Sequence, residues 1–296
     1  MKVTLPHLHE LKLAGTPIVM VTAYDHPSGR IVDQAGVDLV LVGDSAANTV
    51  LGHDPVSTVR ATMEELLILT RAVSRACTAP LVIGDLPFMS YQVSDEDAVR
   101  NGGRFIKEAG ADAVKLEGGG QSVQRAAALV AAGIPVMGHI GLTPQTATML
   151  GGHKAQGRQW QQARALYESA IALEAAGCFG IVLECVPEPV AAAISRRLAI
   201  PTIGIGSGAA TDGQVLVLHD LLDIHPDSGE MPRFIKAYAH IGAAMREGVE
   251  AYASEVRARA FPAPEHTYPI APDQLSAFET AIAAAGTADD NILADW

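Results

Sequence analysis

Short apolar runs alternate along the chain with longer stretches of helical periodicity. Two of the helical stretches end at Ala35-Gly36 and Ala109-Gly110, and a β-branched run follows each pair at once. A glycine just past a helix serves as its left-handed cap, and the same arrangement recurs further along the chain. These pairs therefore predict repeated helix-to-strand junctions.

The predicted strands are nearly continuous apolar runs rather than strict alternations of apolar and polar residues. They cover residues 18–21, 39–42, 81–83, 113–116, 135–137, 180–183, 202–205 and 215–218, with helices at 62–77, 95–109, 122–132, 160–176, 189–198 and 233–257. Strands of this kind are typical of parallel sheets covered by helices. Alternation with helices favours a closed (β/α)₈ TIM barrel, and an open doubly wound sheet is the alternative. We expect one barrel domain over residues 1–268 and a C-terminal tail over 269–296 that lies on the surface or moves freely.

Composition excludes several classes of protein. Of the 296 residues 49% are apolar and 18% charged, which argues against disorder. Lys plus Arg number 21 against 33 Asp plus Glu, and no basic cluster stands out, so a nucleic-acid partner is not expected. No apolar run approaches the roughly 20 residues that a membrane-spanning helix needs. A polar amino terminus and three scattered cysteines predict a cytoplasmic protein.

Chemically active side chains follow five successive predicted strands. In chain order they are Asp44 with Ser45, then Asp85, then Lys115 and Glu117, then His139, then Glu184. In a (β/α)₈ barrel the carboxyl ends of all strands meet on one face, so these residues are expected around a single mouth. Lys115 and Glu117 are two apart on a strand and should point the same way.

Each of these residues also has an ordinary structural explanation. An Asp after a strand often caps the next helix, and a histidine or a Lys–Glu pair in a core can simply be hydrogen-bonded. Glu184 could belong to a solvated loop. Four carboxylates at one mouth, however, would repel one another strongly unless a cation lies among them, and one lysine is not enough.

The ligand types indicate which cation this is. Asp44 and Asp85 offer hard oxygen atoms, which suit Mg²⁺, with Mn²⁺ or Co²⁺ as substitutes, and Glu117 would touch the metal directly or through a water. Such an ion keeps open positions that an α-keto acid could fill by chelation. The carbon next to the ketone then becomes acidic because the metal stabilises the enolate. Glu184, not committed to metal, is the candidate base.

The motifs around these residues resemble the ketopantoate hydroxymethyltransferase family, also called 3-methyl-2-oxobutanoate hydroxymethyltransferase, in order and at family spacing from about residue 11 to 268. They are Met20-Val21-Thr22-Ala23-Tyr24-Asp25, Val42-Gly43-Asp44-Ser45, Gly84-Asp85-Leu86-Pro87-Phe88-Met89, Val114-Lys115-Leu116-Glu117-Gly118-Gly119, Gly138-His139-Ile140-Gly141-Leu142-Thr143-Pro144-Gln145, Leu183-Glu184-Cys185-Val186-Pro187, and Ile203-Gly204-Ile205-Gly206 with Thr211-Asp212-Gly213-Gln214.

The resemblance implies transfer of a hydroxymethyl group from 5,10-methylenetetrahydrofolate to α-ketoisovalerate, giving ketopantoate on the route to pantothenate and coenzyme A. It implies one Mg²⁺ per subunit and a homo-oligomer, typically a decamer. By the same resemblance Asp44 and Asp85 are metal ligands that also contact substrate, and Glu117 reaches the metal through water. Ser45, Lys115 and His139 bind the keto acid, and Glu184 is the base.

Two departures from the family pattern stand out. Many members carry Leu-Gly-Met after the Asp-Ser pair, where this chain has Ala46-Ala47-Asn48-Thr49. The tail from Ala271 to Trp296 is longer than usual. From the first departure we therefore expect the loop after the strand at 39–42 to shape the pocket differently, and we assign no folate contacts to it.

Three other functions remain open at this point. A Schiff-base aldolase would use Lys115 as its nucleophile. An enzyme like phosphoenolpyruvate mutase or isocitrate lyase would share the barrel and a Mg²⁺-bound keto acid without needing folate. A scaffold that had lost catalysis would not need its charged residues, and their presence argues against it.

Overall fold

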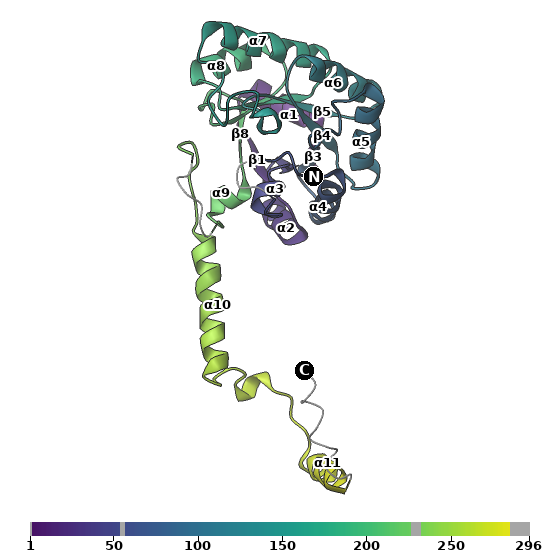
Figure 1. The fold of residues 1–296 in the computed structure, drawn as a ribbon, viewed down its shortest axis with the longest axis vertical. Helices are drawn as coiled ribbons and strands as arrows, with labels where there is room; N and C mark the ends of the chain where they lie inside the picture. Colours follow the sequence, from purple (N-terminus) through teal and green to yellow (C-terminus); the bar gives the residue numbers. More distant parts are fainter. Residues whose placement is uncertain (1, 54–56, 226–231, 285–296) are drawn as a thin grey trace. The chain divides into compact units, whose positions relative to one another are not determined.

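Eight parallel strands close into a barrel in which each strand pairs with its sequence neighbours and the last returns to the first (Figure 1). The computed structural model describes residues 2–53, 57–225 and 232–284. The predicted (β/α)₈ barrel is confirmed, and the open sheet is excluded because β8 pairs with β1.

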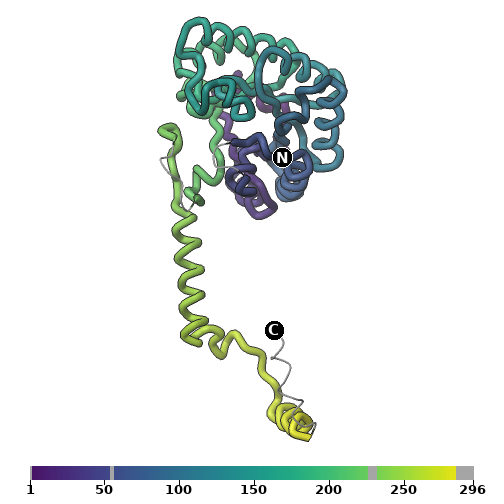
Figure 2. The backbone as a smooth tube through the Cα atoms, in the orientation of Figure 1, coloured from purple at the N-terminus to yellow at the C-terminus, as the bar shows by residue number. Residues whose placement is uncertain are grey.

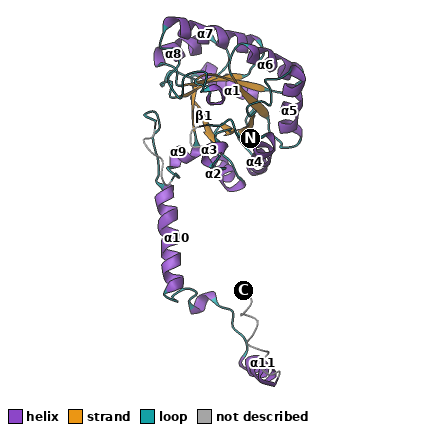
Figure 3. Cartoon of the chain, viewed as in Figure 1, coloured by secondary structure: helices purple, strands orange, loops and turns teal. Residues whose placement is uncertain are grey.

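The elements alternate as the sequence pattern predicts. The strands are β1 (Ile18–Thr22), β2 (Leu39–Val42), β3 (Leu81–Asp85), β4 (Ala113–Glu117), β5 (Val136–Gly141), β6 (Gly180–Glu184), β7 (Thr202–Ile205) and β8 (Gly213–Leu216). The helices are α1 (Leu5–Ala14), α2 (His26–Gln34), α3 (Ala46–Thr49), α4 (Met63–Ala76), α5 (Asp95–Lys107), α6 (Gln121–Ala131), α7 (Trp160–Ala175), α8 (Glu188–Arg197), α9 (Leu218–Leu222), α10 (Ile241–Arg257) and α11 (Pro272–Ala284), with short 3₁₀ turns η1 (Pro144–Thr146) and η2 (Pro264–His266). In the barrel the helices surround the strands (Figure 3).

Two predicted boundaries near the end of the barrel are wrong. β8 ends at Leu216, because Leu218 already starts α9 and its N–H donates to Thr22 Oγ1 at 2.8 Å. The helix expected from residue 233 begins at Ile241. Before Ile241, the Tyr238 N–H donates to the Leu221 carbonyl at 2.8 Å. This tertiary hydrogen bond takes the place of the bond that Tyr238 would donate within a helix.

The junctions between helices and strands follow local chemistry. Gly36 and Gly110 have φ of +76° and +74°, as expected of residues that end a helix in the left-handed region. At the start of α4, Thr62 and Glu65 form a reciprocal capping box. Such caps fix where each helix begins. The backbone trace in Figure 2 follows the chain around the barrel.

The barrel interior is apolar at one end and charged at the other. Side chains such as Ile18, Leu81 and Met137 fill the amino-terminal end of the strands, and Leu8 of α1 packs against them. A second core lies between the sheet and its outer helices and includes Phe105 and Leu129. The amino end is therefore closed by packing, and the carboxyl end is left for polar groups.

Close packing between β3 and α5 gives a stability prediction. A Cβ on Gly84 would overlap the buried Phe105 ring, lying 2.8 Å from its Cε1. We expect Gly84→Ala to lower the free energy of unfolding by about 1–3 kcal/mol through overpacking. Gly103→Ala is the matched control, because a Cβ there meets no atom within 4 Å and helical alanine gains roughly 0.5–1 kcal/mol over glycine. Urea denaturation measures the free energy of unfolding of both variants. Equal values for the two variants would show that α5 shifts to make room for the added methyl group.

The chain divides into two units at Gly242, with Met1–Gly242 as the first and Ala243–Trp296 as the second. The expected end of the barrel domain was residue 268, so the second unit takes in most of α10 as well as the expected tail. Neither α10 nor α11 has a buried residue. The tail expected over 269–296 contains the helix α11, and residues 285–296 lie outside the described part. Among the described residues, no helix is long and apolar enough to cross a membrane.

Candidate active site

The strand register brings the predicted site residues side by side. In the sheet Asp85 is paired with Lys115, and Glu117 with His139. A pocket of about 850 Å³ is lined by all seven predicted site residues: Asp44, Ser45, Asp85, Lys115, Glu117, His139 and Glu184. Five of these are almost fully buried, while Ser45 and Glu184 are half-buried. The structure thus assembles one charged pocket from five consecutive strand ends.

Lys115 lies at the centre of this group. Its Nζ is 2.9 Å from Asp85 Oδ1 and 3.7 Å from Glu117 Oε1, so Lys115 and Glu117 do point the same way. Burial alone would lower the pKa of Lys115, but the charges of Asp85 and Glu117 outweigh it and raise that pKa above its ordinary value. The side chain is therefore an ammonium ion at neutral pH.

His139 lies between the carboxylates of Glu117 and Glu184. Its Nδ1 is 3.4 Å from Glu117 Oε1, and its Nε2 is 3.2 Å from Glu184 Oε2. Burial and Lys115 both lower the pKa of His139, yet its contacts with the Glu117 and Glu184 carboxylates raise it to about 9. A protonated imidazole thus lies within ion-pair distance of the Glu184 carboxylate at the edge of the pocket.

Asp44 and Asp85 are direct neighbours. The Asp44 backbone N–H donates to Asp85 Oδ2 at 3.1 Å. Burial raises the pKa of Asp85 to about 7; Asp44 and Glu117 also raise it, and Lys115 lowers it. The four carboxylates of this pocket, Asp44, Asp85, Glu117 and Glu184, thus face two cationic side chains, Lys115 and His139.

Gln145 and Tyr91 hold these carboxylates in place and were not assigned a role from sequence. Gln145 donates through Nε2 to Asp44 Oδ2 and through its backbone N–H to Glu117 Oε2, both at 3.0 Å. Tyr91 donates its hydroxyl to Gln145 Oε1 at 2.8 Å. Gln145 follows Pro144 just past a strand end, which is the one signal that pointed to it. Nothing in the pattern around Tyr91 did so.

Ser45, which follows β2, is held in place by Tyr24, a residue just after the end of β1. Its Oγ lies 2.8 Å from the hydroxyl of Tyr24, whose ring is buried. This contact turns the Ser45 hydroxyl into a fixed group beside Asp44. The segment that follows, where the sequence departs from the family pattern, forms the short helix α3 rather than an open loop.

The pocket chemistry fits a hard divalent cation. Glu117 Oε1 is buried and accepts no hydrogen bond within the described part of the chain. Across residues 2–53, 57–225 and 232–284, no three histidine, cysteine or carboxylate side chains are arranged to enclose a metal on their own. Two carboxylates and retained waters or substrate oxygens are what Mg²⁺ commonly uses, so this donor set suits it.

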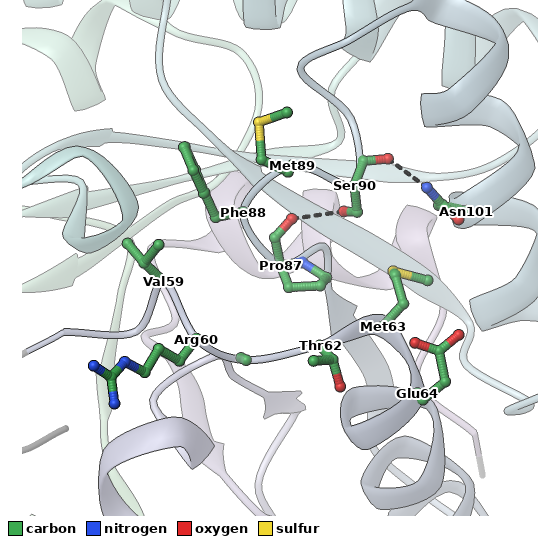
Figure 4. A pocket seen from close by; sticks show the side chains of 11 residues that line it. Val59, Arg60, Thr62, Met63, Glu64, Pro87, Phe88, Met89, Ser90 and Asn101 are labelled. Atoms are coloured by element: carbon green, nitrogen blue, oxygen red, sulfur yellow. Dashed lines mark hydrogen bonds between the residues drawn. The ribbon is translucent and has the colours of Figure 1, made fainter. Parts of the chain in front are cut away.

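A second cavity lies outside this site. It measures about 370 Å³ and lies at the N-terminus of α4, next to the segment that follows β3 (Figure 4). Phe88, Met89 and Val59 line it. Two further lining residues are linked, because Asn101 Nδ2 donates to the Ser90 carbonyl at 2.7 Å. It contains none of the predicted site residues.

Comparison with known proteins agrees with the motif resemblance. A family model described as ketopantoate hydroxymethyltransferase matches residues 2–264. A Carboxydothermus hydrogenoformans protein named 3-methyl-2-oxobutanoate hydroxymethyltransferase is 51% identical over 274 residues, which is 93% of this chain and 98% of that protein. An Arabidopsis thaliana protein named 3-methyl-2-oxobutanoate hydroxymethyltransferase 1, mitochondrial, is 48% identical over 290 residues, covering 96% of this chain and 83% of that protein.

Solved structures share the fold at low identity. A phosphoenolpyruvate phosphomutase from Streptomyces platensis subsp. rosaceus aligns with a TM-score of 0.56 and 17% identity, over 95% of this chain and 96% of that one. A 2,3-dimethylmalate lyase of the PEP mutase/isocitrate lyase superfamily gives a TM-score of 0.55 and 16% identity, over 98% and 100%. At this identity the likeness concerns the barrel alone.

Proposed function

The chain belongs to the ketopantoate hydroxymethyltransferase family, and from this premise we propose that it transfers a hydroxymethyl group from 5,10-methylenetetrahydrofolate to 3-methyl-2-oxobutanoate, giving 2-dehydropantoate. One observation supports the proposal: the pocket has two cationic side chains, Lys115 and His139, beside clustered carboxylates and a half-buried glutamate, Glu184. A small keto acid needs such a combination to bind and lose a proton. We place the reaction first in the pantothenate branch, and a homo-oligomer belongs to the same proposal.

The metal belongs to the proposal as well. Asp44 and Asp85 would hold a Mg²⁺ directly, and Glu117 would reach it through a water, with the Asp44 N–H bond to Asp85 fixing one carboxylate. When bound, the ion would supply positive charge that stabilises the negative charge developing on the keto oxygen.

The chain's own residues bind the keto acid and move its proton. Lys115 and His139 are both cationic and attract the carboxylate of the substrate, while the Ser45 hydroxyl is available to donate a hydrogen bond. Glu184 takes the proton from the carbon next to the ketone. That carbon forms the new bond to the one-carbon unit, one water supplies the hydroxyl oxygen, and tetrahydrofolate is released.

The charge state of Lys115 argues against the Schiff-base alternative. An amine nucleophile must lose its proton, which calls for a lowered pKa. Asp85 and Glu117 raise the pKa of Lys115 instead. Its role is therefore electrostatic, and borohydride should trap no adduct between Lys115 and the keto acid.

The proposal is tested by measuring 2-dehydropantoate formation by mass spectrometry from both substrates. We expect turnover with 3-methyl-2-oxobutanoate, 5,10-methylenetetrahydrofolate and Mg²⁺ together, and none when either substrate is omitted or when EDTA removes the metal. Restoring Mg²⁺ after chelation should restore activity. Turnover that survives EDTA would overturn the metal assignment, and product formed without folate would overturn the donor.

A further inference from the structure

The pocket is larger than a five-carbon keto acid requires. Pockets of about 300–1,000 Å³ hold drug-sized ligands, and this one measures about 850 Å³. The charged groups described above come from β2 to β6, and they account for one part of the lining. A second part of the wall comes from β7, β8 and the residues that follow them, and smaller parts come from β1, α3 and the segments after α3 and β5.

The part of the wall from β7, β8 and the chain after them is mainly apolar. It includes Ile205, Val215, Val217, Phe234 and Ile235, so it presents branched aliphatic groups and one aromatic ring to the pocket. Apolar and aromatic surfaces of this kind bind planar heterocycles, and a few placed polar groups set the orientation.

The polar groups of this wall are Asp220 and His225. Both line the pocket, with side chains 21% and 25% exposed, and His225 Nε2 lies 3.5 Å from Asp220 Oδ1. Within the described residues this long contact is the one side-chain partner that Asp220 has. Burial raises the pKa of Asp220 above its ordinary value, as expected of a carboxylate short of hydrogen-bond donors.

A neutral histidine ring packs against this pair. The ring of His219 lies between those of Tyr24 and His225, at centroid distances of 5.3 and 5.4 Å. Burial and His225 lower the pKa of His219 to about 4, so this ring is neutral at pH 7. The wall thus offers a carboxylate to the pocket with one histidine beside it, and would repel the anionic keto acid rather than bind it.

We propose that Asp220, assisted by His225, recognises the pteridine ring of the folate co-substrate at this wall; this rests on the proposed function. The ring carries an amino group next to a ring N–H, and two adjacent donors match the two oxygens of a carboxylate. The apolar side chains then contact the ring faces, and the pteridine lies in the same pocket as the keto acid bound near Lys115 and His139.

Asp220→Asn tests this assignment. The amide keeps the shape of the side chain but loses the charge and one acceptor, so the KM and Kd for 5,10-methylenetetrahydrofolate should rise about 10–100-fold, as for hydrogen bonds to a charged group. The Kd of 3-methyl-2-oxobutanoate with Mg²⁺, measured by calorimetry without folate, should stay within about twofold of wild type, which also shows that the variant is folded.

A matched control and a matched ligand sharpen the result. Asp223→Asn makes the same change three residues along, at an exposed carboxylate bonded to His240 Nδ1 at 2.8 Å, and should leave folate binding unchanged. A folate analogue without the ring amino group should bind wild type about 10–100-fold more weakly than folate does. The Asp220→Asn variant should bind this analogue and folate with almost equal affinity.

The possible failures are distinguishable. If wild type binds the keto acid but no folate, the proposed donor is wrong and this inference falls with it. If wild type binds folate and Asp220→Asn binds it equally well, only the assignment of Asp220 is overturned. Loss of keto acid binding together with folate binding in the variant would also overturn it, because the residue would then support the pocket as a whole.

Discussion

Replacing Asp85 with asparagine is expected to lower kcat/KM by roughly 10³ or more, because a metal ion acting as a Lewis acid contributes several kcal/mol to such a reaction. Asparagine can still accept the Asp44 N–H bond that Asp85 Oδ2 accepts at 3.1 Å. It cannot supply the negative charge that faces Lys115 Nζ at 2.9 Å. The variant should therefore keep the local structure and lose the ion.

Metal-dependent stabilisation separates this effect from simple unfolding. A ligand present at 100 times its Kd stabilises the native state by about 2.7 kcal/mol, so Mg²⁺ should raise the melting temperature of wild type and leave that of Asp85→Asn unchanged. Differential scanning calorimetry with Mg²⁺ and with EDTA measures this.

Asp33→Asn is the control variant, because it also replaces a buried, hydrogen-bonded carboxylate with an amide but lies away from the proposed metal site. Asp33 accepts the N–H groups of Thr78 and Ala79 at 3.1 and 2.9 Å, with a side chain 7% exposed, and it does not line the pocket. This variant should lose stability but keep the full response to Mg²⁺. An undiminished Mg²⁺ response in Asp85→Asn would show that the ion is held elsewhere.

The convergence of the site residues could be predicted because barrel geometry leaves little freedom. Once eight buried strands alternate with helices, every carboxyl end lies on the same face, so Asp85 and Glu184 must share a mouth whatever the details of packing. Register then decides which side chains meet across strands, as in the pairing of Asp85 with Lys115, and strand periodicity alone does not set that register.

What sequence did not reveal depends on long-range contacts. Tyr91 lies beyond the strand that bears Asp85, and its hydroxyl reaches Gln145 and the Glu117 N–H only because the segments after β3 and β5 meet at the end of β4. The chain before α10 has a helical composition, yet the Tyr238 bond to Leu221 keeps it irregular. Hydrophobic periodicity carries no information on either contact. Asp220 is similar, since its place in the pocket depends on where β8 ends.

Replacing Glu184 with glutamine is expected to lower kcat by about 10²–10⁴, the usual contribution of a general base. Glu184 ends β6, is half-buried with a side chain 16% exposed, and its Oε2 lies 3.2 Å from His139 Nε2. Glutamine keeps the size and one acceptor for the protonated imidazole but cannot take a proton. Binding of Mg²⁺ and of the keto acid should therefore survive while proton removal stops.

Solvent exchange isolates that step from the transfer that follows it. With Mg²⁺ and 3-methyl-2-oxobutanoate in D₂O and no folate, wild type should introduce deuterium at the carbon next to the ketone, and Glu184→Gln should do so at least 10²-fold more slowly, as seen by proton NMR. Glu188→Gln makes the same change at the first residue of α8, where Oε1 accepts the Ala209 N–H at 3.3 Å outside the pocket lining, and should exchange at the wild-type rate. Unaltered exchange in Glu184→Gln would mean that another group takes the proton, and Glu117, whose Oε1 accepts no hydrogen bond among the described residues, would be the next to test.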